Sequence, residues 1–154
     1  MIANYKTPQK TDLMVELHVP DFGKAKEFYL SLGFEVVWER KPVNGADGYM
    51  VMRRGESIIN FHGGTEDVAD HKYFGKFPKD SKRGYAVEII IPIDGIKDFY
   101  KQAQQKYPKN IVQPLEKKFA FPDFRMEDPF GFYLRFVDRY NWVETRDKDG
   151  KSTV

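Results

Sequence analysis

The chain has 154 residues, of which 41% are hydrophobic and 31% charged, a balance typical of one globular domain with a substantial core. It contains no cysteine, which excludes disulfides, thiolate catalysis and zinc–cysteine sites. Its 25 basic and 23 acidic residues are interspersed and give a net charge of +2, so no nucleic-acid-binding stripe stands out. No apolar run approaches the roughly 20 residues of a membrane helix. We therefore expect a soluble, cytoplasmic protein with neither nucleic acid nor membrane as a partner.

The first half of the chain predicts one strand, one helix and three further strands. Residues 13–19 alternate between apolar and polar side chains, which predicts a half-buried strand with Glu16 and His18 on its polar face. A helix is expected next, with Asp21 as its N-cap and Gly33 as the left-handed glycine after its end. The other three strands are expected at residues 34–40, 49–53 and 57–62.

Residues 65–83 have no sustained period, so we interpret them as a connector in which His71 is expected at the surface. The first pattern then returns, with a strand at residues 85–91 and a helix at residues 94–107 that begins at Asp94. Phe28 and Phe99 correspond in this repeat, at an offset of 71 residues. Three more strands are expected at residues 111–113, 119–126 and 132–138.

Two copies of a βαβββ unit are therefore predicted, which makes this an α+β fold. The first module spans residues 13–64 and the second spans residues 84–138, joined by the connector. One four-stranded unit alone leaves a sheet face bare, so we expect the two to form a curved mixed sheet around a shared cavity. A polar arm at residues 1–12 and a tail at residues 139–154, in which Trp142 is the candidate for docking, complete the chain.

Motifs at both ends of residues 13–138 resemble those of a known superfamily. The opening motif is Glu16-Leu-His-Val-Pro-Asp21, followed by Phe28-Tyr29 and Leu32-Gly33-Phe34. The closing motif runs from Arg125 to Val137 and contains an Asp-Pro-x-Gly turn at Asp128. Together they resemble the vicinal oxygen chelate superfamily, which includes glyoxalases, dioxygenases and bleomycin resistance proteins. The resemblance implies the tandem βαβββ fold already expected from the element order.

The resemblance also places metal ligands, usually His and Glu, on four cavity strands. The corresponding positions here carry Met14, Ile58, Val87 and Arg135. Aliphatic side chains have no donor atom, a thioether is a weak ligand, and a guanidinium repels a cation. We therefore expect no metal and no cofactor. The nearest resemblance is then to the bleomycin resistance protein branch, whose members bind a drug as homodimers without a metal of their own.

A ligand site is predicted on the polar faces of the strands. An inward-facing arginine needs an anionic partner, and for Arg135 this is either Glu16 or a carboxylate or phosphate of the ligand. The third alternative is that the strand face is misread and the Arg135 side chain is exposed. Trp38, Tyr49 and Phe121 are candidate aromatic walls, with core packing as the alternative for Trp38. The ligand is thus expected to be aromatic or anionic. The predicted ligand-binding residues are Met14, Glu16, His18, Trp38, Tyr49, Asn60, His62, Phe121 and Arg135.

Binding without catalysis, with antibiotic sequestration as its purpose, is the leading hypothesis, and three others stay open. His18 and His62 are expected to lie near each other and could form a displaced metal site of a lyase or dioxygenase. Glu16 or His18 could act as a general base in a metal-free enzyme. The chain could also be a purely structural dimer without a ligand.

Overall fold

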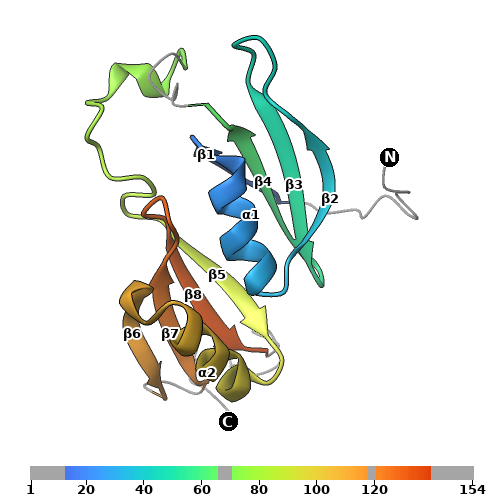
Figure 1. Cartoon of the computed structure of the whole chain (residues 1–154). Helices are drawn as coiled ribbons and strands as arrows, with labels where there is room; N and C mark the ends of the chain where they lie inside the picture. Colours follow the sequence, from blue (N-terminus) through green and yellow to red (C-terminus); the bar gives the residue numbers. More distant parts are fainter. Residues whose placement is uncertain (1–12, 66–70, 118–120, 140–154) are drawn as a thin grey trace. The chain divides into compact units, whose positions relative to one another are not determined.

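The computed structural model describes residues 13–65, 71–117 and 121–139 (Figure 1). The chain divides between Ser81 and Lys82 into two compact units, and each unit contains one βαβββ copy. The predicted arm at residues 1–12 and the tail that follows residue 139, including Trp142, lie outside the described residues. No helix in the described ranges is long and apolar enough to cross a membrane.

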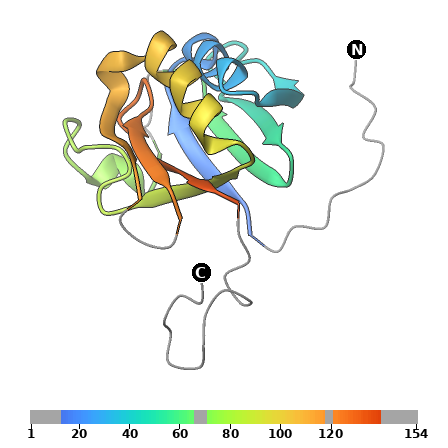
Figure 2. The ribbon, with the colours of Figure 1, turned by 90° about the horizontal axis from the view of Figure 1, so that it is seen from below.

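The first unit is a four-stranded sheet with one helix. Its strands pair in the order β1-β4-β3-β2, and β1 is parallel to β4, as predicted for the fourth strand. Figures 1 and 2 show α1 lying along one face of this sheet. Its elements are β1 (Val15–Val19), α1 (Phe22–Ser31), β2 (Glu35–Arg40), β3 (Gly48–Arg54) and β4 (Ser57–Gly63).

Both predicted ends of α1 are confirmed. Asp21 is the N-cap, and its carboxylate accepts a hydrogen bond of 3.0 Å from the backbone N–H of Lys24. Gly33 has a φ of +81° directly after the helix, where a side chain would be strained. The N–H of Phe34 then returns to the carbonyl of Tyr29 at 3.0 Å, which satisfies one of the last carbonyls of the helix.

The helix and one face of the first sheet form the core of the first unit. Tyr29 of α1 packs on Phe61 of β4 with 5.0 Å between ring centres, and both side chains are fully buried. Strand alternation places Leu17 and Val19 on this same face. Glu16, His18, Asn60 and His62 therefore belong to the opposite face, which we call the open face of the sheet.

The second unit repeats this architecture, with strand order β5-β8-β7-β6 and a parallel β5/β8 pair. Its helix packs through Phe99 onto Phe136, and Phe136 stacks on Phe124 with 5.1 Å between ring centres. Its elements are β5 (Glu88–Ile93), α2 (Ile96–Lys106), β6 (Ile111–Glu116), β7 (Asp123–Glu127) and β8 (Tyr133–Asp138).

The structure corrects the register of the repeat. The N-cap of α2 is Gly95, in the left-handed conformation, rather than Asp94, whose carboxylate instead accepts from Arg139 at 2.9 Å. The buried positions of α1 recur in α2 at an offset of 74 residues rather than 71, as Phe22 and Ile96 show.

Two predicted strands of the second unit also move along the chain. The strand predicted at residues 85–91 begins three residues later, at Glu88, and Val87 is 54% exposed outside it. With the corrected offset, Glu88 rather than Val87 corresponds to Met14. The strand predicted at residues 119–126 is β7 and begins at Asp123, so Phe121 precedes it.

Candidate functional site

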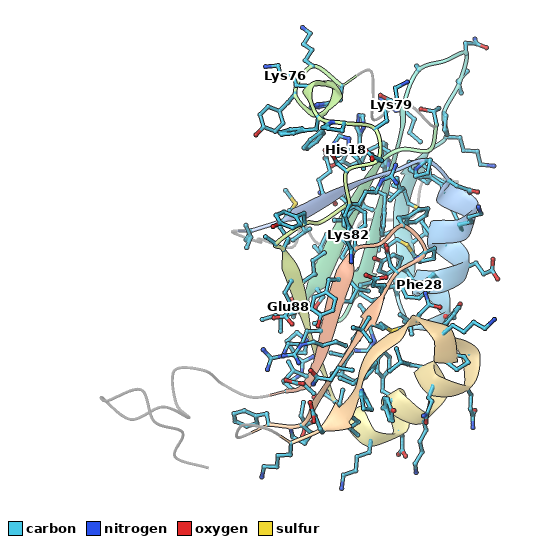
Figure 3. The ribbon with its side chains drawn as sticks, turned by 90° about the vertical axis from the view of Figure 1, so that its left-hand side faces the viewer. His18, Phe28, Lys76, Lys79, Lys82 and Glu88 are labelled. Carbon is cyan, nitrogen blue, oxygen red and sulfur yellow. The ribbon has the colours of Figure 1, made fainter. Side chains whose placement is uncertain are left out.

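The parallel pairing of β1 with β4 brings four of the predicted site residues together on the first open face. Glu16 lies opposite Asn60 in the register, and His18 lies opposite His62. Figure 3 shows His18 beside the segment that carries Lys76 and Lys79, away from the helix that carries Phe28. The prediction that His18 and His62 lie close together is confirmed, with 4.7 Å between their ring centres.

A chain of polar contacts crosses this face from β3 to β1. The Tyr49 hydroxyl donates to Oε2 of Glu16 at 2.6 Å, and Oε1 of Glu16 lies 3.2 Å from Nε2 of His18. Burial, together with the adjacent Glu16 carboxylate, raises the pKa of Tyr49 to about 12. Burial and the neighbouring His62 lower the pKa of His18, and they outweigh the opposing effect of Glu16.

His71 is not a separate surface residue, as the sequence had suggested, because it joins this cluster. Its ring centre lies 5.0 Å from that of His18, so all three histidines of the chain lie in one group. Phe74 packs edge-on against His18 at 4.9 Å and lies 4.7 Å from His71. These contacts could not be predicted, since the connector has no periodicity from which to infer a buried face.

Asn60 is the most buried polar residue of the first open face, at 6% exposure. Its Nδ2 contacts Sδ of Met14 at 3.9 Å, and its Oδ1 is a buried acceptor without a hydrogen-bond partner. The Trp38 ring lies 6.2 Å from that of Tyr49 and is only partly buried, which favours the aromatic-wall interpretation of Trp38 over core packing. Tyr49 and Asn60 thus lie next to Glu16, with Trp38 beyond Tyr49 and Met14 beyond Asn60.

Arg135 lies in the second unit and belongs to a network of charged side chains. Its Nη2 donates to Oδ2 of Asp123, and its Nη1 lies 4.0 Å from Oε2 of Glu88. Arg125 donates to the other Glu88 oxygen at 2.7 Å. Within the second unit, the acids that contact Arg135 are therefore Asp123 and Glu88. Within the first unit, Glu16 contacts Tyr49 and His18. Strand alternation could have identified Glu88 as a site residue, but the sequence places the start of this strand at residue 85 rather than at Glu88.

Comparison with solved structures decides the fold. TioX from Micromonospora sp. ML1 has a TM-score of 0.63 and 18% identity over 85% of this chain and 100% of that chain. A bleomycin-binding protein complexed with bleomycin has a TM-score of 0.57 and 17% identity over 85% and 100%. A glyoxalase family protein from Enterococcus faecalis has a TM-score of 0.58 and 18% identity over 84% and 98%.

The chain has the glyoxalase/bleomycin resistance fold. The α+β class, with two βαβββ units in tandem, is thereby confirmed. No protein-family model and no curated protein matches the sequence.

The four metal-ligand positions implied by the family resemblance shift with the corrected repeat. Glu88 rather than Val87 corresponds to Met14, and Asn60 rather than Ile58 corresponds to Arg135 in the strand registers. Glu88 has a suitable carboxylate, but two guanidinium groups contact it. Among the residues that the structure describes, no group of three or more histidine, aspartate or glutamate side chains is arranged to hold a metal ion. Metal independence itself stays a prediction.

Phe121 lies just before β7 and is partly buried. Its predicted role as an aromatic wall stays a prediction.

Proposed function

We propose that this chain is a small-molecule binding protein of the glyoxalase/bleomycin resistance type that works without a metal, and that its ligand is an aromatic, antibiotic-like molecule. The observation that carries metal independence is Arg135, which occupies the fourth ligand position. Its guanidinium contacts Asp123 and Glu88, the two acids that would otherwise attract a divalent cation there. A cation at this place would meet a fixed positive charge with no lone pair to offer.

The first open face supports an aromatic ligand with hydrogen-bond donors. Trp38 and Tyr49 offer two partly exposed rings for stacking, and Glu16 offers a carboxylate that is 40% exposed. Arg135 is the candidate anchor for an anionic group, but its two Nη atoms already face Asp123 and Glu88, and its unpaired Nε is buried. Aromatic chemistry is therefore better supported than anionic chemistry. The structural similarity to a bleomycin-binding protein supports binding as the function, without identifying the ligand.

Two measurements on chain purified without chelator test the proposal. Elemental analysis should give far less than one equivalent of zinc, nickel, manganese or iron, and stoichiometric metal would overturn metal independence. A thermal-shift screen of aromatic antibiotics should raise the midpoint, since a ligand at 100 times its Kd stabilises by about 2.7 kcal/mol.

Matched variants locate the binding. Trp38→Leu should abolish the shift, whereas Leu30→Ser, which removes an exposed apolar side chain from α1, should leave it unchanged. Equal shifts in the wild type and in both variants would place the ligand elsewhere.

General-base catalysis is the second candidate, favoured by the Glu16–His18 contact of 3.2 Å. With Nε2 directed at a carboxylate and its pKa lowered, His18 is a neutral imidazole at pH 7 whose Nδ1 remains to accept a proton. An activity that rises with pH below 6.5 and is lost in His18→Gln would support it. A displaced metal site at His18 and His62 instead requires metal uptake that disappears when both are replaced by alanine.

A further inference from the structure

Residues 71–77, which we call the strap, fold back onto β1 of the same unit. Within the strap, the N–H of Gly75 donates to the carbonyl of His71 at 2.8 Å, and a short 3-10 helix spans Phe74–Lys76. The strap contacts β1 through two rings, His71 and Phe74, and both pack against the single side chain of His18. Tyr73 and Phe77 of the strap are 57% and 50% exposed, whereas His71 and Phe74 make its ring contacts with β1.

The turn at the start of the strap requires an unprotonated nitrogen on His71. Nδ1 of His71 accepts hydrogen bonds from the backbone N–H groups of Tyr73 at 3.2 Å and Phe74 at 3.3 Å. An imidazolium carries a proton on both nitrogens and can accept neither bond. Protonation of His71 would therefore leave two backbone donors of the turn without their acceptor.

The surroundings of His18 also disfavour its protonation. His62 of β4 and His71 of the strap face its ring, and burial with these two neighbours lowers its pKa. The opposing charge is Glu16 on β1, which Tyr49 of β3 also engages.

Two further charged groups lie at the edge of this cluster. Asp47 lies 3.8 Å from His62, and Lys76 of the strap is directed at the Tyr73 ring, 6.0 Å away. Neither group contacts His18, so Glu16 is the carboxylate that opposes the lowering of the His18 pKa.

We propose that the strap is a pH-sensitive cover of the ligand site, docked on β1 while His18 is neutral and released when His18 takes up a proton. Since His18, Glu16 and Tyr49 belong to the ligand site, release would open one side of it. The regulatory meaning of the strap thus rests on the proposed binding function, although its docking does not.

The sign of the pH dependence follows from proton counting. The released strap binds more protons than the docked strap at pH values below the ordinary histidine pKa of about 6.5. Docking is therefore complete above this pH and weakens as the pH falls through it, by at most about tenfold per pH unit for the single proton taken up by His18.

The absence of cysteine allows a single spin label to report on the strap. Lys72→Cys places the label on an exposed strap residue, and Lys24→Cys places the control label on exposed α1. In the full-length chain without ligand, we expect the strap label to be immobile at pH 8 and to become mobile as the pH falls to 5, while the control label does not change. A strap label equally immobile at pH 8 and pH 5 would overturn the proposal.

A double variant separates histidine protonation from general acid effects. His18→Phe keeps a ring against Phe74, and His71→Asn keeps a side-chain acceptor for the turn, but neither replacement titrates. The strap label should then stay immobile down to pH 5, and release in this variant would overturn the proposal. Near-ultraviolet circular dichroism checks that the variant is folded.

If the double variant does not fold, His18→Phe alone should leave the strap label immobile down to pH 5, and release in that variant would overturn the proposal. In the unlabelled wild type, the imidazole C2–H signal that disappears in His18→Phe should titrate below pH 6.5, and titration above 6.5 would overturn the mechanism. Because no ligand is present, failure here leaves the metal and ligand tests unaffected, and their failure leaves this one standing.

Discussion

Asp123 is the residue on which the charged network of the second unit depends. It is 4% exposed, its Oδ2 accepts from Arg135, and its Oδ1 accepts from Gln113 at 3.2 Å and lies 3.7 Å from Arg125. A buried ion pair adds little net stability, but removal of one partner leaves the other charge without compensation. Asp123 is therefore where a small chemical change should have a large effect.

We predict that Asp123→Asn lowers the free energy of unfolding by about 3 kcal/mol, because two partly buried guanidinium groups then share Glu88 alone. Equilibrium urea unfolding measures this loss. The control is Glu127→Gln, which breaks the exposed pair with Lys82 and should cost about 0.5 kcal/mol or less. Equal losses in the two variants would show that burial of Asp123 has no energetic consequence.

Tyr49 gives a prediction for alkaline conditions. Its pKa of about 12 in the folded chain exceeds the ordinary value of 10, so between these pH values the folded state retains a proton that the unfolded state releases. Stability therefore falls as the pH rises from 10 to 12, and Tyr49→Phe should make this fall shallower. Unfolding free energies at pH 9, 10 and 11 test this. Tyr85→Phe, at a position that is 83% exposed, should not change the slope.

At the scale of elements, the sequence predicted both α-helices and the eight strands of the described residues, because alternation and helical spacing are local patterns. It misplaced the features that depend on distant residues. Both Asp94 and Gly95 can begin a helix, but Arg139 engages the Asp94 carboxylate and Gly95 adopts the left-handed backbone. His71 was assigned to the surface because its partner, His18, lies 53 positions earlier in the sequence.

The end of β4 gives a prediction for a single element. Gly63 has a φ of +105°, and an added Cβ would lie 2.8 Å from the carbonyl oxygen of Val19 in the paired strand β1. We expect Gly63→Ala to cost about 3 kcal/mol, of which the positive φ accounts for about 1–2 kcal/mol. Gly95→Ala also has a positive φ but no atom within 4 Å, so it should cost about 1 kcal/mol by urea unfolding. A Gly63 variant no less stable than the Gly95 variant would contradict the clash with Val19.

At the scale of the whole molecule, the two units share one fold but differ in the chemistry of their open faces. The first combines three histidines with Glu16 and Tyr49, and the second has two arginines balanced by Glu88 and Asp123. The net charge of +2 does not reveal this difference, because it is a sum over the whole chain and does not report how charged residues are distributed between the two open faces. Composition therefore could not predict which unit offers the better site for an uncharged aromatic ring.

We predict a homodimer, as the family resemblance implies. With a chain mass of 18.1 kDa, light scattering at micromolar concentration should give about twice this value. The mass should not change across the pH range in which the strap is expected to release, since the strap contacts lie within one unit. A mass near 18.1 kDa would contradict the prediction.

The parallel pairing of β1 with β4 has a consequence for how the chain acquires its structure during synthesis. Glu16 lies opposite Asn60, and in the second unit Ile90 lies opposite Arg135. In each unit, residues of the first strand are therefore separated from their parallel partners by more than forty positions in the chain. Such non-local pairing slows folding, because the entropy of closing a long loop is lost before the stabilising contacts between the two strands form. On the ribosome, α1 and the β2–β3 hairpin can form while β1 still lacks a partner. The histidine cluster is then among the last features of the first unit to assemble.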